Sequence, residues 1–208
     1  MGNREDLLAA AKRCLIEKGY ARTTARDIAA ASGVSLAAIG YHFGSKDALM
    51  NQAVYESIGD WGEEIERALA AAGDLDAGPL RRFESIMART IESFSGPNSG
   101  LWSAQVELMS LLGRNDELRA FLAGVQTEAA TGLAEMFLGV DPEAEPETAR
   151  LAGSVYHALF IGIIAKWFMD PKQGLTAHEL AEGLRIIANR ICASPEDSAG
   201  GATSSQAS

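Results

Sequence analysis

The chain has 208 residues, 47% of them hydrophobic and 22% charged, and its formal net charge is −10. These are the values of an ordinary globular protein with a sizeable core, so they exclude an intrinsically disordered chain, a collagen-like repeat and a disulfide-stapled scaffold. The charge is uneven, because residues 1–50 carry seven basic and five acidic side chains and the others carry 11 and 23, which would orient the N-terminal end toward a polyanion.

Apolar residues recur at helical spacing from the start of the chain, and no alternating strand pattern is evident. The first helix is expected to begin after Asn3, as its cap, and to end at Gly19. Thr24 and, three residues later, Asp27 resemble a capping box that opens a second helix. A third, short helix is expected over residues 35–42.

The rest of the chain continues the helical pattern in longer segments. Ser45 is expected to open a long helix that ends at Gly73, and further apolar stripes follow it. A turn rich in Pro and Glu at 141–146 leads into a helix over 147–170 that is apolar nearly all round in its middle. A full capping box at 176–179 opens the last helix.

These elements predict an all-α fold of nine helices. The expected domains are an N-terminal three-helix, helix-turn-helix DNA-binding domain at 1–48 and a six-helix domain for effector binding and dimerisation at 49–193. Ser, Gly, Ala, Thr and Gln dominate residues 194–208, so a disordered tail is expected there.

The stretch Thr24–Leu49 carries the most functional information. It consists of a helix, a tight turn containing Gly33 and a second short helix, with Ile28, Ile39 and Phe43 as a small core. This is the helix-turn-helix plan, in which the glycine permits the turn and the second helix enters the major groove of DNA. An ordinary helical hairpin is the alternative.

A set of small, apolar, aromatic and basic residues extends this pattern, consisting of Ile28, Ala29, Ser32, Gly33, Val34, Ser35, Ile39, Tyr41, His42, Phe43, Ser45, Lys46 and Leu49. The set resembles the DNA-binding signature of TetR-family transcriptional regulators, closely over residues 24–49 and as a three-helix domain over residues 5–49. Beyond residue 50 the resemblance is architectural. The family commonly has an aromatic residue, usually Tyr, where this chain has Gly40, so one phosphate-contacting hydroxyl is expected to be missing here.

The residues expected at DNA are Thr24, Arg26, Ser35, Leu36, Ala37, Ala38, Tyr41, His42 and Lys46. Thr24 and Lys46 lie at helix N-termini, where free N–H groups favour phosphates. The resemblance implies backbone contacts for Tyr41 and His42. Bases would be read by the start of the short helix at 35–38, mostly through apolar contact with thymine methyl groups, and guanine by Arg26. A phosphate contact or a free surface position is the alternative for Arg26.

No constellation for catalysis or metal binding is found in the sequence. The three histidines, His42, His157 and His178, lack metal-ligand spacing, and no phosphate-binding glycine loop or Gly-x-Ser-x-Gly string occurs. Cys14 and Cys192 lie at opposite ends of the chain, so no disulfide is expected. We therefore expect no enzyme activity, no catalytic residue, no metal and no cofactor.

A membrane segment is not expected either. The longest strongly apolar run is Ala158 to Ala165, far shorter than the roughly 20 residues that span a bilayer. The first residues show neither a basic segment nor an apolar stretch of the kind found in secretory leaders. The expected location is the cytoplasm, without a membrane partner.

The resemblance implies a pocket for a small, often apolar effector among the middle helices. The large side chains expected to line it are Trp61, Phe83, Met87, Trp102, Gln105, Met109, Phe121 and Tyr156. Gln105, Glu107 and His157 could supply polar anchors. Each large side chain could equally belong to the core.

The resemblance also implies that the last two helices form the interface of a homodimer. The residues expected there are Ala158, Leu159, Gly162, Ile163, Leu184, Ile187 and Ile191. Packing within one subunit is the alternative.

Taken together, the sequence predicts a ligand-responsive regulator, a repressor in most of the family, that binds a palindromic double-stranded DNA operator as a dimer. Two other classes stay open, a helical scaffold that binds small molecules and an enzyme, both without DNA binding.

Overall fold

The computed structural model describes residues 2–74 and 78–193, and over these residues it confirms an all-α fold of nine helices. The helices are α1 (Asn3–Lys18), α2 (Ala25–Ser32), α3 (Leu36–Phe43), α4 (Lys46–Ala72), α5 (Pro79–Ser93), α6 (Ser99–Leu111), α7 (Asp116–Leu138), α8 (Pro146–Met169) and α9 (Ala177–Cys192), with a 3₁₀ turn, η1 (Pro171–Gln173), between the last two. The tail expected over 194–208 lies outside the described residues.

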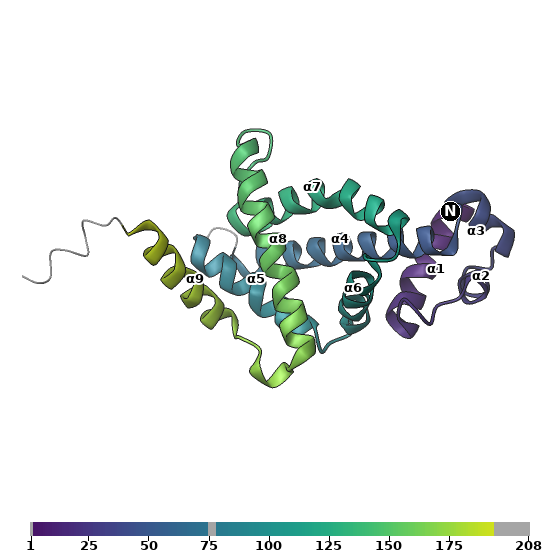
Figure 1. Ribbon diagram of the computed structural model, residues 1–208, viewed down its shortest axis with the longest axis horizontal. Coiled ribbons are helices and arrows are strands. Elements are labelled where there is room, and N and C mark those ends of the chain that lie inside the picture. Colours follow the sequence, from purple (N-terminus) through teal and green to yellow (C-terminus); the bar gives the residue numbers. More distant parts are fainter. Residues whose placement is uncertain (1, 75–77, 194–208) are drawn as a thin grey trace, which may run out of the picture.

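The helices are arranged along one long axis (Figure 1). Helices α1–α3, here called the N-terminal unit, gather at one end. Helix α4 runs from that end into the middle of the molecule, where α5–α8 surround it, and α9 lies at the opposite end. We call α4–α9 the C-terminal unit.

Side-chain caps fix where several helices begin. The Thr24 hydroxyl accepts a hydrogen bond from the Asp27 N–H, and the Asp27 carboxylate accepts one from the Thr24 N–H, so the expected capping box is confirmed. Thr176 and Glu179 form the same box at α9, and the Ser45 hydroxyl accepts from the Ala48 N–H at α4. Each such cap stabilises its helix by about 1 kcal/mol.

The start of α1 differs from the prediction, because Gly2 is the cap and Asn3 is the first helical residue. The Gly2 N–H donates to the Glu5 carboxylate at 3.2 Å, while no side chain at the cap accepts a hydrogen bond from the first turn. At the end of α2 Gly33 has φ +72°, a left-handed conformation that glycine adopts without strain. This glycine turns the chain from α2 toward α3.

Each unit has its own part of the hydrophobic core. Leu7 and Leu15 of α1, Ile28 of α2, Ile39 of α3 and Leu49 of α4 are buried together in the N-terminal unit. Since α4 begins inside this core, the first turns of α4 belong physically to both units.

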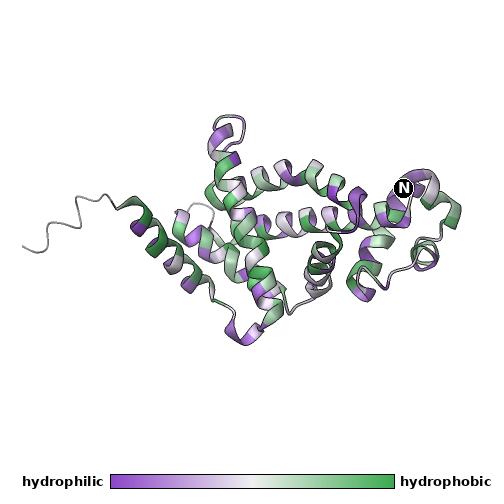
Figure 2. Cartoon of the chain, viewed as in Figure 1, coloured by the Kyte–Doolittle hydropathy of each residue, from purple (hydrophilic) through white to green (hydrophobic). Residues whose placement is uncertain are grey.

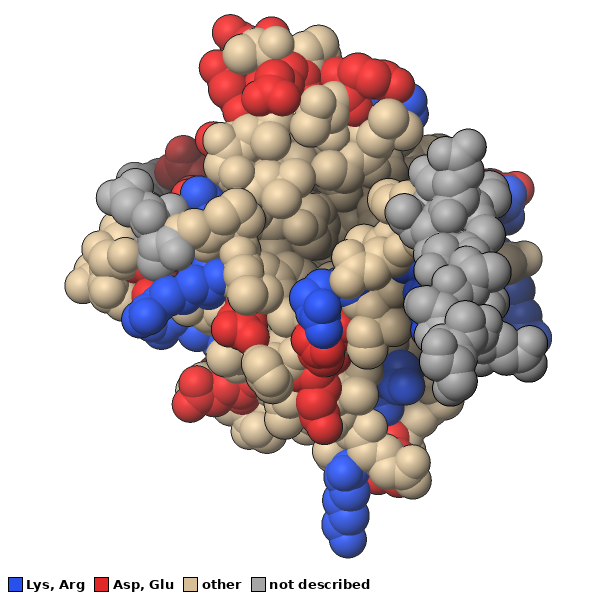
Figure 3. Space-filling model, turned by 90° about the vertical axis from the view of Figure 1, so that its left-hand side faces the viewer, with Lys and Arg blue, Asp and Glu red and all other residues tan. Residues whose placement is uncertain are grey.

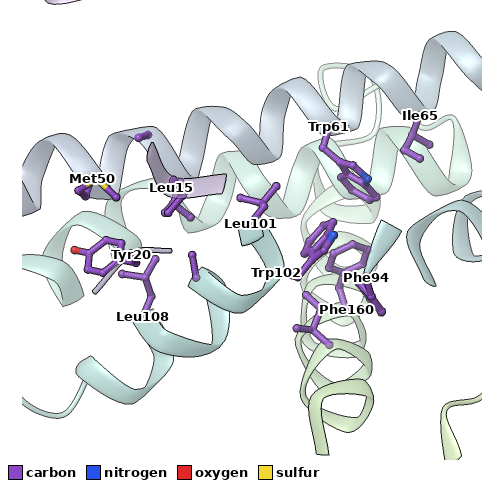
Figure 4. Close-up of a cluster of buried hydrophobic side chains, with 14 of the residues drawn as sticks. Leu15, Tyr20, Met50, Trp61, Ile65, Phe94, Leu101, Trp102, Leu108 and Phe160 are labelled. Atoms are coloured by element: carbon purple, nitrogen blue, oxygen red, sulfur yellow. The ribbon is translucent and has the colours of Figure 1, made fainter. Parts of the chain in front are cut away.

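An aromatic cluster forms the centre of the C-terminal unit. Trp61 of α4 meets Trp102 of α6 edge to face at 4.9 Å between ring centroids, and Phe94 and Phe160 lie within 5.7 Å of Trp102 (Figure 4). Trp102 is completely buried. The cluster therefore ties α4, α5, α6 and α8 to one another.

Helix α8 meets the length and composition of a membrane-spanning helix, which the search for unbroken apolar runs did not indicate. Its 24 residues are long and apolar enough by length and composition, with a mean hydropathy of 1.4 over the most apolar 18-residue window. The prediction considered only unbroken apolar runs, and α8 interrupts its runs with single polar residues. Only 17% of that window is buried, and hydrophobic residues are visible along α8 and α9 in Figure 2. The helix thus carries much apolar surface that this chain alone does not cover.

Candidate nucleic-acid interface

Helices α2 and α3 form the helix-turn-helix that the sequence predicts. Ile28 and Ile39 face inward and are almost fully buried. In the turn the Val34 N–H donates to the Ser32 hydroxyl at 3.2 Å, and the Gly33 N–H donates to the carbonyl of Ala29 at 3.0 Å. Buried contacts and local hydrogen bonds therefore fix the angle between the two helices.

The outer face of α3 is open to solvent. Leu36 is 49% exposed and Tyr41 86% exposed. Ser35 and Ala37 are exposed as well, whereas Ala38 is half-buried. The face expected to read bases is thus accessible along the whole of α3.

Thr24 is less available to a phosphate than its position suggests. Its hydroxyl donates to the Asp27 carboxylate at 2.7 Å, and its backbone N–H donates to the same oxygen at 2.9 Å. Lys18 pairs with Asp27 at 2.6 Å, and these partners lower the pKa of the Asp27 carboxyl. In this structure both donors of Thr24 are engaged by an ionised carboxylate.

Lys46 begins α4 and has two neighbours. Its Nζ lies 2.7 Å from the Asp47 carboxylate and 5.3 Å from the centre of the Tyr20 ring, and its side chain is 27% exposed. A phosphate at this helix N-terminus would compete with Asp47 for the ammonium group. By contrast Arg26 is exposed and forms none of the ion pairs or hydrogen bonds among the described residues.

Tyr41 and His42 lie together at the end of α3. Their rings meet edge to face, with centroids 4.9 Å apart. His42 is half-buried, because it also lines a cavity between the two units. Gly40 precedes them and is exposed, and a Cβ built there would meet nothing within 4 Å.

Helix α6 contacts the N-terminal unit directly, which the sequence analysis did not predict. A Cβ at Gly100 would lie 2.5 Å from the Ile16 carbonyl oxygen, so α6 abuts the backbone of α1. Two turns later, on the same face of α6, the Glu107 carboxylate accepts a hydrogen bond from the Ala21 N–H at 2.9 Å. Glu107, considered as a possible pocket anchor, instead holds the turn between α1 and α2.

The same turn is also held from α4. The Tyr20 hydroxyl donates to the Asn51 side-chain oxygen at 2.7 Å, and both residues are buried. Burial is the main cause of the raised pKa of Tyr20, so its hydroxyl stays protonated as a donor. The residues joined here are 31 and 86 positions apart in the chain, a separation at which no local sequence pattern indicates contact.

Four of the expected effector residues, Trp61, Phe83, Met87 and Trp102, are buried in the core of the C-terminal unit. Tyr156 is half-buried and stacks on Phe137, with centroids 4.5 Å apart and an interplanar angle of 10°.

Gln105, Met109 and Phe121 are half-buried. Phe121 meets Tyr55 edge to face at 6.2 Å and lines the same cavity as His42. Of the eight residues, Phe121 lines this cavity, and none of them lines the groove beside α8 that is described below.

The residues expected at a dimer interface share one region of the surface. Ala158, Leu159, Gly162 and Ile163 line a groove of about 350 Å³ between α8, α5 and the start of α9. On α9 Ile187 is 55% and Ile191 78% exposed, and Leu184 is half-buried. Figure 3, which looks onto the α9 end, shows a hollowed stretch of surface without charged side chains.

The comparison of the sequence with family profiles finds one family. Residues 7–53 match the profile described as "Bacterial regulatory proteins, tetR family". This segment comprises α1–α3 and the beginning of α4, so it contains all the residues expected at DNA.

Curated proteins with similar sequences are regulators. Over 120 residues the chain is 30% identical to the HTH-type transcriptional repressor DhaR of Mycobacterium sp. (strain GP1), covering 57% of this chain and 59% of that protein. It is 26% identical to the HTH-type transcriptional repressor KstR2 of Rhodococcus jostii (strain RHA1), covering 67% and 63%. The chain thus spans about three fifths of the length of these relatives.

Solved structures show the same fold over nearly the whole chain. One of them is the Thermus thermophilus FadR, a TetR-family transcriptional repressor in complex with lauroyl-CoA, with a TM-score of 0.62 at 19% identity. The match covers 98% of this chain and all of that one. At this identity the likeness establishes the fold alone.

Proposed function

Since this chain belongs to the TetR family of bacterial regulatory proteins, we propose that it is a cytoplasmic transcriptional repressor that binds a palindromic operator as a homodimer. In this proposal, the protein dissociates from the operator when a small, apolar effector binds to it. The observation that carries the proposal is the outer face of α3, where Leu36 and Tyr41 are exposed beside Ser35 and Ala37. No contact within the described chain accounts for large apolar and aromatic side chains in that position.

In the proposed complex α3 lies in the major groove. Leu36 and Ala37 contact thymine methyl groups, Ser35 supplies a hydroxyl, and Arg26 donates to O6 and N7 of a guanine. Tyr41 and Lys46 bind phosphates and fix the register of the helix. The excess of basic residues among positions 1–50 supports this orientation on an otherwise acidic chain.

The proposed dimer uses the apolar surface of α8 and α9. Helix-turn-helix proteins bind as two-fold dimers whose half-sites lie roughly 34–36 Å apart, so the two copies of α3 need a rigid connection. Val155 of α8 is 65% exposed, and Ile187 and Ile191 of α9 are more than half exposed. An apolar stripe of this extent is typical of an interface rather than of a free surface.

The effector is proposed to act through the contacts that the C-terminal unit makes with the N-terminal unit. Trp102 of α6 lies in the aromatic cluster, while Gly100 and Glu107 of the same helix contact α1 and the turn after it. A ligand that displaces the cluster would move α6 and α4, and with them α3. The effector can release DNA only to the extent that it binds the DNA-free form of the protein more tightly than the DNA-bound form.

Selection of bound fragments from a random duplex library tests the proposal, followed by gel shifts with the recovered duplex. The double variant Tyr41→Ala/Lys46→Ala should bind it about a thousandfold more weakly, because two phosphate contacts of about 1 kcal/mol each are lost in both protomers of the dimer. A control variant on the C-terminal unit, Lys172→Ala in the exposed turn η1, should bind like the parent. Failure to enrich any duplex at low salt would instead favour a helical scaffold or an enzyme without DNA binding.

A further inference from the structure

A cavity lies between the N-terminal and C-terminal units, apart from the residues expected to bind the effector in the core. Its volume is about 250 Å³, and it is bounded by the end of α3, the first turns of α4 and the start of α7. Figure 1 shows these three segments beside one another at the junction of the units. Any molecule in this cavity would therefore touch both units.

The lining offers two aromatic rings and a few polar groups. Phe43 comes from α3 and Phe121 from α7, and Glu117 of α7 is the one lining residue with a formal charge at neutral pH when His42 is neutral. Glu117 is exposed and forms none of the ion pairs or hydrogen bonds among the described residues. Its carboxylate is therefore available to a ligand.

Asn51 adds a donor from the buried side of the cavity. The residue is 3% exposed, and its side-chain oxygen is taken by the Tyr20 hydroxyl. Its amide nitrogen takes part in none of the hydrogen bonds among the described residues. It is also not one of the fully buried polar side-chain atoms that lack a hydrogen-bond partner in this part of the chain. Both observations are consistent with an Asn51 amide N–H group that faces the cavity.

One face of the Phe43 ring is already covered by a cation of the chain itself. The Arg4 guanidinium lies 5.1 Å from the centre of the Phe43 ring, and Arg4 also donates to the Gln52 side chain at 3.1 Å. Arg4 does not line the cavity. A carboxylate beside aromatic faces is the arrangement that recognises an organic ammonium ion, through ion pairing and cation–π attraction together.

We propose that this junction cavity is a binding site for small organic ammonium ions, with the ammonium group at Glu117 and the apolar body between Phe43 and Phe121. The volume is below the roughly 300–1,000 Å³ of sites for drug-sized ligands, so the ligand is a small one. Because the cavity is half-open, binding is weak, and the charge of Glu117 contributes on the order of fivefold in affinity.

A ligand in the cavity would also affect α3 and DNA binding. This part of the inference rests on the proposed function. His42 lines the cavity and adjoins Tyr41, and both are expected at the DNA backbone. A bound ammonium ion adds positive charge beside His42 and holds the end of α3 against α7. It therefore changes the affinity of the protein for its operator without entering the core of the C-terminal unit.

The site is tested on the full chain, without DNA, by NMR titration with three probes that share a ring and differ in charge. These are benzylammonium, benzyl alcohol and benzoate at constant ionic strength. Benzylammonium should bind saturably, about fivefold more tightly than benzyl alcohol, with shifts at the Asn51 side-chain amide. Benzoate should bind most weakly. Equal affinities for the cation and the alcohol, or no saturable binding of the cation, would overturn the proposal.

Two neighbouring carboxylates provide a matched pair of variants. Glu117→Gln should weaken benzylammonium binding about fivefold and leave benzyl alcohol binding unchanged. Asp116→Asn makes the same chemical change one residue earlier, where the carboxylate pairs with Arg119 at 2.9 Å, and should leave both affinities unchanged. Both carboxylates are exposed, so both variants should fold. A Glu117→Gln variant that binds benzylammonium like the parent would contradict the assignment. Because these titrations contain no DNA, their outcome is independent of whether the protein is a repressor.

Discussion

Two surfaces at opposite ends of the molecule expose hydrophobic side chains, and they differ in what surrounds them. At the α3 end Leu36 and Tyr41 are exposed singly, among small residues and beside the free guanidinium of Arg26. At the α8–α9 end large aliphatic side chains form continuous stripes, with Ile187 and Ile191 on α9. The first surface suits a polar, hydrated and charged partner, and the second suits a dry, apolar one.

The two surfaces also differ in the length and packing of the helices that form them. Helix α3 has eight residues and packs on α1, α2 and the start of α4, and the turn between α1 and α2 is held from α4 and α6 by two hydrogen bonds. Helices α8 and α9 are two to three times longer and adjoin the large aromatic core. A short element with few buried contacts is easier to displace than a long one, as the proposed release of DNA requires.

The largest effect is expected from charges on the apolar surface. The double variant Ile187→Asp/Ile191→Asp should weaken the proposed dimer at least a thousandfold, because about 1.5–3 kcal/mol of burial is lost for each Ile and each new carboxylate must be desolvated. Sedimentation velocity over a concentration series measures the change. The helicity of the chain should stay the same, since both side chains are exposed in the single chain. An unchanged dimer would show that another surface joins the copies.

The next effect concerns the charged surface at the other end. Lys46→Ala should lower operator affinity about thirtyfold at low salt, because one phosphate contact of about 1 kcal/mol is lost in each protomer of the dimer. The slope of log affinity against log salt should fall by about 1.8, which is about 0.9 for each lost contact. Lys172→Ala, which removes a charge from the exposed turn η1, serves as the control and should change neither quantity. A slope that is the same for the parent and Lys46→Ala would mean that Asp47 keeps the ammonium group.

A smaller effect is expected within α3 itself. Gly40→Ala should raise the free energy of unfolding by about 1 kcal/mol, because alanine favours a helix and a Cβ there meets nothing. Gly33→Ala is the contrasting control, since Gly33 has φ +72° and the change should destabilise by about 1 kcal/mol. Denaturant unfolding measures both. A destabilised Gly40→Ala variant would show that α3 needs a flexible residue at that position.

The contact between α6 and the turn after α1 should have a modest effect on stability and a clearer one on local motion. Glu107→Ala should cost about 1 kcal/mol and speed hydrogen exchange of the Ala21 amide, whose acceptor is lost. Glu107→Gln keeps a side-chain oxygen and should restore most of the protection. If the alanine and glutamine variants exchange alike, the hydrogen bond does not hold the turn.

The smallest effect is a pH dependence at the start of α2. Hydrogen bonds from Lys18 and Thr24 lower the pKa of Asp27 in the folded chain below its ordinary value of about 3.9. Asp27 therefore adds stability above that value and loses it as the pH falls toward the folded pKa. Unfolding between pH 6 and pH 3 should show a steeper loss for the parent than for Asp27→Asn. Equal losses would assign the acid sensitivity to other carboxylates.

The sequence predicts the elements whose signals are local. The capping boxes at Thr24 and Thr176 and the turn at Gly33 are read from residues three or four apart, and the structure contains each of them. The same holds for the helix-turn-helix, since both of its helices and the turn between them lie within 20 residues.

Contacts between distant helices could not be read in this way. Gly100 against Ile16 and Glu107 against Ala21 bring together residues with no shared pattern, so the role of α6 at the junction appears only in the structure. Trp61 and Trp102 show a second limit of sequence analysis. Large apolar residues at helical spacing are typical both of a packed core and of a ligand pocket, so the pattern does not distinguish the two.

The central claim is that two copies of the chain, joined through α8 and α9, place two copies of α3 one turn of DNA apart. Sedimentation of the full chain with the selected duplex, combined with footprinting, tests it most directly. We predict two chains per palindrome and two protected half-sites centred roughly 10–10.5 base pairs apart. A complex of one chain per duplex, or a single protected half-site at saturating protein, would contradict it.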